Sequence, residues 1–340
     1  ALNPLDPLTA DEIQTTFTVI KPSQNLAPGT FFPTIKLSEP PKADVLALSP
    51  GQPFQRRAFA NVFDRSGDKL YEAIVDLRTN QLLSWTQRVG AQPAVYLTEW
   101  TDASKIVHNY GPWKTAIRAR GIDPKDAYVD IWAPGDLPVP GVPTGTRLLR
   151  AIAFYGGSLP NPYDRPIEGP VVTIDMNKLK VVDFVDSGIR PVDTTTTGNA
   201  TSERSGLRPL LVQQPDGPSF QISNGRDVAW QNWRFRVDYT PREGLVLHRI
   251  GYAQGNTVRP IIYRLSMSEI YVPYALPDPN WAWRSAFDIG EYNLGQYANP
   301  LGTNVDVPEN AVFFDEVTSL DTDAFDASFA VPHAAAMYER

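Results

Sequence analysis

The sequence predicts an α+β protein, in which two small domains, each a helix with an antiparallel sheet, precede the first part of a large antiparallel β-sandwich. Three observations lead to this fold class. The 340 residues include 32 prolines and 23 glycines, which favour short strands and turns over long helices. A strand–turn–strand pattern occurs twice in the first part of the chain, and alternating aromatic and polar residues follow it. A chain of this length suggests two or three domains.

An internal repeat predicts the two small domains, residues 1–95 and 96–192. Short strand-like segments at 75–77 and 82–83 flank a polar turn, and the same arrangement returns at 174–176 and 181–182. Each copy begins with a helix signal, in which Thr9 or Thr98 is a candidate N-cap followed by carboxylates in the first turn. Further strands are expected at 55–64, 147–155 and 170–175. The pattern therefore indicates two copies of one helix-plus-sheet unit.

A change of composition separates these domains from the third. Residues 193–206 contain almost no apolar side chain, which is typical of a linker. Residues 207–340 are expected to form the first part of a β-sandwich, with strands at 219–223, 229–239, 244–252 and 259–266. In the second of these strands, the aromatic and apolar side chains alternate with polar ones, so one face should be buried and the other solvated. The alternating residues are Trp233, Phe235, Val237 and Tyr239.

The composition excludes several classes of function. With 31 basic and 38 acidic residues the formal net charge is -7, which argues against a nucleic-acid partner because phosphate binding needs clustered Lys and Arg. No run of eighteen apolar residues is present, so no membrane-spanning helix is expected. The chain has no cysteine, which excludes disulfides, thiolate metal sites and cysteine nucleophiles. These observations leave the compartment open.

The three histidines do not form a recognisable metal site. His108, His248 and His333 are far apart in the sequence and never occur as His-x-His. That spacing directs two imidazoles from one strand to the same side. We therefore expect no metal site within this chain, and we expect His248 to be a packed core residue at the end of a strand.

A tyrosine and a carboxylate beside a glycine turn are the strongest candidates for chemistry. Tyr274 precedes Asp288, and Gly290 follows Asp288 within the segment 283–292. Taken alone, Tyr274 is more typical of packing, and Asp288 of a turn in which the carboxylate accepts hydrogen bonds from its own backbone. A glycosidase that uses Asp288 and Glu291 is disfavoured, because two acids so close around one turn have no evident geometry across a cleft.

Five segments, in their order along the chain, carry a resemblance to a known family. They are Asn161-Pro-Tyr-Asp-Arg-Pro-Ile-Glu-Gly169, Gln214-Pro-Asp-Gly-Pro-Ser-Phe220, Trp230-Gln-Asn-Trp-Arg-Phe235, Pro241-Arg-Glu-Gly-Leu-Val-Leu-His248 and Phe287-Asp-Ile-Gly-Glu-Tyr292. Together with the doubled small domain, they resemble the copper-containing topaquinone amine oxidases over nearly the whole chain. The resemblance implies oxidative deamination of a primary amine by dioxygen, which yields an aldehyde-level product, ammonia and hydrogen peroxide.

The resemblance also implies roles for individual residues. Asp288 matches the base that removes the α-proton of the substrate, and Tyr274 matches the tyrosine that donates a hydrogen bond to the quinone. Ala286 stands where the family often has a large aromatic gate, which implies a wider channel that admits bulky amines. Phe287 and Tyr163 are expected to line the substrate channel.

The other half of such an active site is not found in this sequence. In the family, the tyrosine that becomes topaquinone and the three copper histidines lie further along the chain. We therefore expect a second polypeptide to carry topaquinone and copper(II). Cleavage after Arg340, a split gene and a truncation would each separate the halves; cleavage is favoured because residues 207–340 alone would leave half a sandwich with open edges.

The expected assembly has two copies of each chain. The alternative from another class is a non-catalytic binding or assembly module with the same fold, which predicts a monomer that is stable without a partner.

Overall fold

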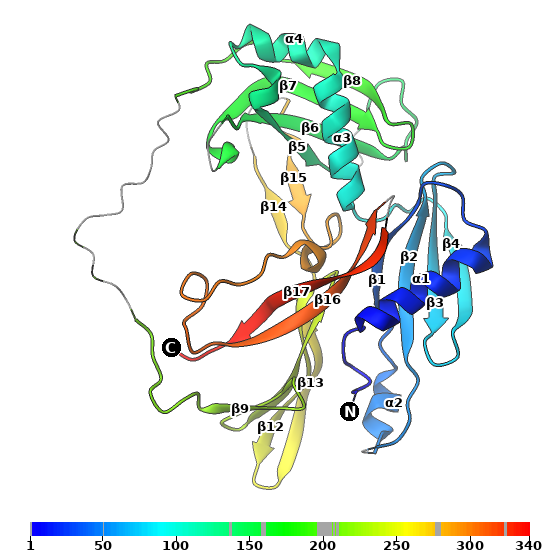
Figure 1. Ribbon diagram of the computed structural model, residues 1–340, viewed down its shortest axis with the longest axis vertical. Helices are drawn as coiled ribbons and strands as arrows, with labels where there is room; N and C mark the ends of the chain where they lie inside the picture. The colour runs from blue at the N-terminus through cyan, green and yellow to red at the C-terminus, as the bar shows by residue number, and fades with distance from the viewer. Residues whose placement is uncertain are drawn as a thin grey trace.

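The predicted α+β class is confirmed, because a few helices accompany several antiparallel sheets (Figure 1). The computed structural model describes residues 2–49, 51–135, 138–157, 161–195, 206, 208, 211–275, 280–322 and 325–340. Most of the predicted linker, residues 193–206, lies outside these ranges. Within them, no helix has the length and apolar character needed to cross a membrane.

The first domain is a helix packed on a four-stranded antiparallel sheet. Helix α1 (Ala10–Gln24) begins at the predicted cap: the Thr9 hydroxyl accepts a hydrogen bond from the Glu12 N–H (3.2 Å), and the Glu12 carboxylate accepts one from the Thr9 N–H (2.9 Å). Phe17 and Ile20 on its buried face pack on the sheet. The sheet has the order β1 (Thr30–Leu37), β2 (Arg57–Asp64), β3 (Lys69–Asp76) and β4 (Gln81–Arg88), and the short helix α2 (Lys42–Ala47) precedes β2.

The second domain places two helices, α3 (Leu97–Asn109) and α4 (Gly111–Ala119), on a second four-stranded antiparallel sheet. Its strands, in sheet order, are β5 (Ala127–Trp132), β6 (Leu148–Tyr155), β7 (Pro166–Asp175) and β8 (Lys180–Asp186); 3-10 turns lie at η1 (Pro124–Asp126) and η2 (Pro162–Asp164). The predicted Thr98 cap is wrong. Thr98 lies inside α3, because the buried Glu99 carboxylate accepts a hydrogen bond from the Tyr96 N–H (3.3 Å) and the helix therefore begins earlier.

The third domain contains a five-stranded antiparallel sheet of order β13-β12-β11-β10-β9. Its strands are β9 (Phe220–Ser223), β10 (Asp227–Trp230), β11 (Trp233–Thr240), β12 (Gly244–Gln254) and β13 (Thr257–Ser266). The single strand predicted at 229–239 is wrong. Trp230 pairs with Trp233 across a tight turn, in which Gln231 has a positive φ of 48°, so the chain reverses inside the predicted strand.

Both faces of β11 are buried toward its end, which contradicts the predicted solvated face. Arg236 and Asp238 are only 3% and 2% exposed. Arg236 pairs with Asp227 (2.6 Å) and with Asp6 of the first domain, while Asp238 lies 3.2 Å from the ring of His248. Buried charges are tolerated when they are paired, so a face that looks polar in the sequence becomes an interface between domains. His248 is itself fully buried, as predicted, but it lies inside β12 and not at the end of a strand.

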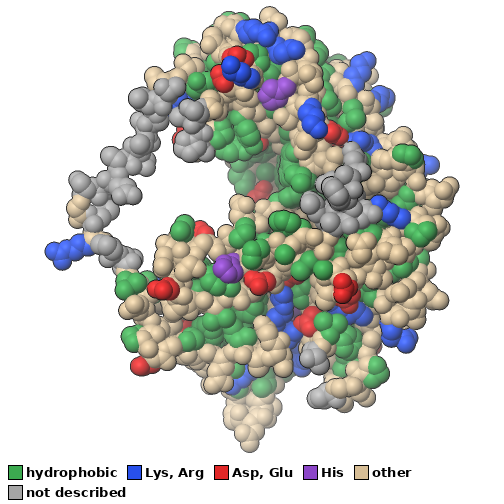
Figure 2. All heavy atoms as spheres, in the orientation of Figure 1, with side chains coloured by type: hydrophobic (Ala, Val, Ile, Leu, Met, Phe, Trp, Pro, Cys, Tyr) green, Lys and Arg blue, Asp and Glu red, His purple; other side chains and the backbone are tan. Residues whose placement is uncertain are grey.

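Two hairpins complete the third domain. Strand β14 (Tyr271–Pro273) pairs with β15 (Ser285–Phe287), and β16 (Val312–Thr322) pairs with β17 (Phe325–Met337); η3 (Leu294–Tyr297) lies between the hairpins in the sequence. The β16–β17 hairpin packs on the five-stranded sheet and also contacts β1 and α1 of the first domain (Figure 1). Figure 2 shows that the molecule is hollowed between the second domain and this hairpin, where hydrophobic side chains gather.

Candidate active site

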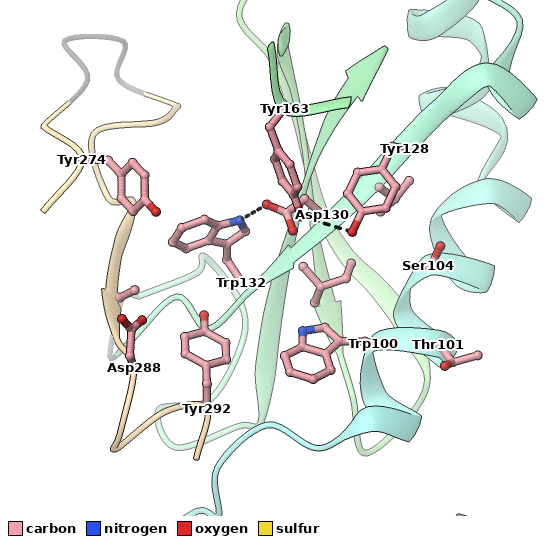
Figure 3. A pocket seen from close by; sticks show the side chains of 13 residues that line it. Trp100, Thr101, Ser104, Tyr128, Asp130, Trp132, Tyr163, Tyr274, Asp288 and Tyr292 are labelled. Carbon is pink, nitrogen blue, oxygen red and sulfur yellow. Dashed lines mark hydrogen bonds between the residues drawn. The ribbon is translucent and has the colours of Figure 1, made fainter. Parts of the chain in front are cut away.

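A cavity of about 530 Å³ lies where the second domain meets the β14–β15 hairpin of the third (Figure 3). Helix α3, strand β5 and the turn η2 contribute residues from one side, and β15 with the segments that follow β14 and β15 contributes residues from the other. The lining residues are Trp100, Thr101, Ser104, Tyr128, Val129, Asp130, Ile131, Trp132, Tyr163, Tyr274, Ala286, Asp288 and Tyr292. Two of these are carboxylates, and the Arg284 guanidinium carbon lies behind two of the lining rings, 4.2 Å from the centroid of Trp132 and 4.1 Å from that of Tyr274.

Asp288 lies half-buried in a turn that directly follows β15. The turn is held by hydrogen bonds from the Asp288 N–H to the Ile270 carbonyl (3.0 Å) and from the Glu291 N–H to the Phe287 carbonyl (2.8 Å). Burial raises the pKa of Asp288, and the negative charge of Glu269 raises it further. A carboxylate in this setting is more basic than a free aspartate, which suits it for taking a proton.

Glu269 and Glu291 support this turn through hydrogen bonds with the backbone. The Glu269 carboxylate accepts hydrogen bonds from the N–H groups of Ile289 (2.8 Å) and Gly290 (3.0 Å), and the Glu291 carboxylate accepts one from the Phe287 N–H (3.0 Å). The Glu291 carboxylate is thus hydrogen-bonded within the turn, and Glu291 is not among the residues that line the cavity. Glu269 was not predicted from the sequence. The one indication there was an acidic residue two positions before the short strand β14.

Tyr274 and Ala286 lie on the same side of the cavity as Asp288. The Tyr274 side chain is 43% exposed; its ring meets the edge of Trp132 at a centroid distance of 5.0 Å, and the guanidinium carbon of Arg284 lies 4.1 Å from its centroid. Ala286 is 5% exposed and packs in a cluster with Trp132 and Trp281. Its small side chain therefore forms part of a packed cavity wall.

Phe287 does not line this cavity. Successive residues of a strand point to opposite sides, so Phe287 faces away from the side to which Ala286 contributes. Its side chain is 42% exposed, and its ring lies 4.7 Å from that of Tyr271. Of the five residues predicted for the site, Tyr163, Tyr274, Ala286 and Asp288 are brought together, and Phe287 is not.

Strand β5 supplies a polar row that the sequence reasoning missed. Tyr128, Asp130 and Trp132 alternate along the strand and line the cavity from the same face. The Trp132 indole N–H donates to the Asp130 carboxylate (2.6 Å), and the hydroxyls of Tyr128 and Tyr163 lie 3.2 Å apart (Figure 3). Burial raises the pKa of Asp130 and, with the neighbouring Tyr128 and Asp130, that of Tyr163. The period-two spacing of these residues was the signal available in the sequence.

The histidines lie in separate places. The Nε2 atom of His108 lies 3.2 Å from the Ala127 carbonyl, His248 lies beside Asp238, and His333 stacks on Phe313 at 3.8 Å between centroids. In the parts of the chain that the structure describes, no group of three or more His, Asp or Glu side chains is arranged to hold a metal ion. The donor groups of the described residues therefore do not fit a copper site.

Comparisons with known proteins agree with this architecture. Three domain models match the chain: copper amine oxidase N2 domain over residues 3–88, copper amine oxidase N3 domain over 98–202, and copper amine oxidase enzyme domain over 221–340. A primary amine oxidase of Arthrobacter sp. (strain P1) is 35% identical over 321 residues, which cover 92% of this chain and 48% of the relative. A primary amine oxidase of Klebsiella aerogenes is 29% identical over 343 residues, which cover 99% of this chain and 45% of the relative.

The fold is shared with solved structures of the same kind. The crystal structure of a copper-containing benzylamine oxidase from Hansenula polymorpha superposes with a TM-score of 0.82 at 23% identity, covering 98% of this chain and 54% of that one. The chain thus spans about half the length of the curated relatives it matches.

Proposed function

Because the chain belongs to the copper amine oxidase family, we propose that it supplies the base and part of the substrate channel of an enzyme that oxidises a primary amine to an aldehyde. The reaction consumes dioxygen and water and releases ammonia and hydrogen peroxide. The observation that carries the proposal is the common cavity of Asp288, Tyr274, Ala286 and Tyr163, four residues from two domains that the family resemblance had singled out separately.

Asp288 is the residue that takes the proton. No lysine or arginine is among the described residues that line the cavity beside its carboxylate, and its raised pKa increases its strength as a base. Removal of a proton from carbon needs a base held close to that carbon, and the turn bonded to Glu269 holds Asp288 in position.

Membership of the family implies that the enzyme uses copper and topaquinone. Of the groups that would surround these cofactors, this chain contributes only residues of the cavity wall. The quinone, when bound, accepts the electrons that the amine loses. The Tyr274 hydroxyl, on the same side as Asp288, would donate a hydrogen bond to a quinone oxygen and fix the orientation of the ring. The copper ligands and the quinone tyrosine would come from residues outside this sequence, since its three histidines are dispersed.

The second polypeptide and the two copies of each chain are part of this proposal. The greater length of the relatives supports a missing half, and it is equally compatible with one longer polypeptide. Denaturing electrophoresis of the purified active enzyme distinguishes these arrangements. A quinone-containing band separate from the 37.7 kDa band of this chain supports two chains. A single quinone-containing band of about twice that mass contradicts the two-chain arrangement.

The test of the chemistry uses the Asp288→Asn variant of the complete, copper-loaded enzyme. Loss of a general base should lower kcat by about two to four orders of magnitude. The quinone absorbance that phenylhydrazine abolishes should persist, because the asparagine preserves the size of the side chain and the cofactor is assembled elsewhere. The control is Asp11→Asn, which removes an exposed carboxylate from α1. Full activity of Asp288→Asn would refute the assignment of the base.

The same measurements address the non-catalytic alternative. A binding or assembly module predicts no quinone absorbance and no hydrogen peroxide from any primary amine, in the wild type as well as in the variants.

A further inference from the structure

We propose that Arg284 is a positioning residue that holds the Tyr274 ring beside Trp132 and thereby fixes the direction of the Tyr274 hydroxyl at the cavity. The inference rests on the proposed function, in which that hydroxyl donates a hydrogen bond to a quinone oxygen. It adds a residue that is not among those lining the cavity and that acts on the site through Tyr274.

Arg284 and Tyr274 are cross-strand neighbours at the end of the β14–β15 hairpin. The last residue pair of the hairpin is Pro273 with Ser285, so the next pair along the two chain segments is Tyr274 with Arg284. The Tyr274 N–H donates to the Arg284 carbonyl at 3.2 Å, which continues the backbone pairing to this position. Directly opposite residues of an antiparallel pair have their side chains on the same face, and this brings the guanidinium to the phenol ring.

The Arg284 guanidinium contacts two perpendicular rings at once. Its carbon atom lies 4.1 Å from the centroid of Tyr274 and 4.2 Å from that of Trp132, and the planes of the two rings meet at 89°. The rings of Trp281 and Phe154 lie further away, at 5.4 and 5.9 Å. Contacts of a cation within about 6 Å of a ring centroid are attractive. The buried Nε atom of Arg284 has no hydrogen-bond partner among the described residues, so aromatic rings surround this part of the side chain in place of a polar acceptor.

Trp132 is the buried side of this contact, and Tyr274 is the exposed side. Trp132 is 8% exposed, and its indole N–H donates to the Asp130 carboxylate at 2.6 Å (Figure 3). Tyr274 is 43% exposed and follows β14 without being part of it. A side chain with that exposure keeps rotational freedom unless a contact removes it. By joining the exposed ring to the buried one, the guanidinium restricts Tyr274 before its hydroxyl has to form a hydrogen bond, which lowers the entropy cost of that bond.

The positive charge of Arg284 also reaches other groups of the cavity. Burial lowers the pKa of Arg284, and the neighbouring Tyr274, Asp130, Tyr163 and Tyr292 oppose this effect. The guanidinium nevertheless stays protonated, because arginine is not deprotonated in proteins. A test must therefore separate loss of the planar stack from loss of the charge. Arg284→Lys keeps a cation and loses the plane, and Arg284→Met loses both.

The kinetic test is a double-mutant cycle in the complete, copper-loaded enzyme. Arg284→Met should lower kcat by about twofold to thirtyfold, the range expected for a cation–π contact. In an enzyme that already carries Tyr274→Phe, the same change should have no further effect, because Arg284 acts through the Tyr274 hydroxyl. Arg284→Lys should also lower kcat, since it loses the planar stack. Losses that add in the double variant, or a wild-type kcat in Arg284→Lys, would overturn the proposal.

The matched control is Arg65→Met in the first domain. The Arg65 guanidinium carbon lies 4.9 Å from the ring centroid of Phe31, so its removal deletes a similar ring contact at a distance from the cavity lining. This variant should keep the kcat of the wild type. A loss of kcat as large as that of Arg284→Met would mean that the effect comes from general destabilisation, and would count against the positioning role.

A spectroscopic measurement keeps this inference separate from the oxidation itself. The enzyme is labelled with 3-fluorotyrosine, and the 19F resonance of Tyr274 is identified as the one that Tyr274→Phe removes. In Arg284→Met and Arg284→Lys this resonance should narrow and shift toward that of the free amino acid, because the ring gains mobility. Arg65→Met should leave it unchanged.

The two readouts fail independently. A Tyr274 resonance that is indifferent to both Arg284 variants, in an enzyme that oxidises amines, would overturn the positioning role and leave the proposed function intact. A resonance that depends on Arg284, in an enzyme that shows no quinone absorbance and forms no hydrogen peroxide, would retain the hold of Arg284 on the ring and refute the proposed function.

Discussion

The Glu269 carboxylate holds the turn that follows Asp288, and its negative charge adds to burial in raising the pKa of Asp288. The carboxylate accepts hydrogen bonds from Ile289 and Gly290, the two residues that follow Asp288. Gly290 permits this approach, since a Cβ atom there would lie 2.9 Å from a Glu269 oxygen. One acidic side chain, just before β14, thereby connects the shape of the turn to the chemistry of the candidate base.

Replacement of Glu269 by glutamine should lower the pKa of Asp288. The variant keeps an oxygen that can accept from the turn and removes the negative charge that disfavours ionised Asp288. Because the base acts when deprotonated, the acid limb of kcat/KM against pH should move to lower pH. Glu309→Gln, at an exposed position, is the control with an unchanged limb. A limb of Glu269→Gln that stays in place or moves to higher pH would contradict the coupling.

Replacement of Tyr274 by phenylalanine should lower kcat by about tenfold to a hundredfold, the value of a hydrogen bond to a charged group. The ring and its packing on Trp132 are kept, so the free energy of unfolding should hardly change. The quinone absorbance maximum should shift, because the ring loses a hydrogen bond. Tyr271→Phe serves as a matched control, since Tyr271 is 53% exposed and lies outside the cavity lining. Equal spectra for the two variants would rule out the contact.

Replacement of Ala286 by phenylalanine should narrow the cavity. The ratio of kcat/KM for benzylamine to that for methylamine should fall by about tenfold, since added bulk in a pocket discriminates by such factors. Overpacking against Trp132 and Trp281 should also lower the free energy of unfolding by about 1–3 kcal/mol. The adjacent Phe287→Leu change, outside the cavity lining, should leave the ratio unaltered. An equal loss of rate for both amines would argue against a role of Ala286 in admitting bulky substrates.

Replacement of Glu99 by alanine should lower the free energy of unfolding by about 3–5 kcal/mol, measured by urea denaturation. Glu99 is fully buried and forms a bidentate pair with Arg147, which also donates to the carbonyls of Pro93 (3.0 Å) and Ala94 (3.2 Å). Its removal leaves a buried guanidinium without a counter-charge. Glu72→Ala, which breaks the largely exposed pair with Arg88, should cost less than about 1 kcal/mol. Similar losses for the two variants would mean that burial of the Glu99 pair has no special consequence.

Predictions from local pattern succeeded where local physics decides the structure. The cap at Thr9 formed because the Thr-x-x-Glu spacing satisfies two backbone donors within one turn of helix. The same reasoning failed at Thr98, where Glu99 forms a buried pair with Arg147 and the helix begins at Leu97, with Tyr96 as its N-cap. The competing contact lies far along the chain, so no local rule includes it.

The two wrong predictions for the third domain, one continuous strand at 229–239 and a solvated face on it, have a similar cause. A run of alternating residues through Trp230 and Trp233 looks like one strand, and the left-handed backbone at Gln231 folds it into two. Arg236 and Asp238 look solvated in the sequence, and they are buried because the first domain and neighbouring strands bring partners to them.

By itself, the sequence determined the α+β class, most of the strands and the motif around Asp288, because hydrophobic period, turn residues and caps act between neighbours in the chain. Only the tertiary structure decided which side chains share the cavity. Asp130 and Asp288 belong to different domains. Phe287 lies outside the cavity lining because its side chain points to the opposite side of β15 from that of Ala286. The physical reason is that a cavity forms where separately folded surfaces pack together, and the residues on its walls need no regular spacing in the sequence.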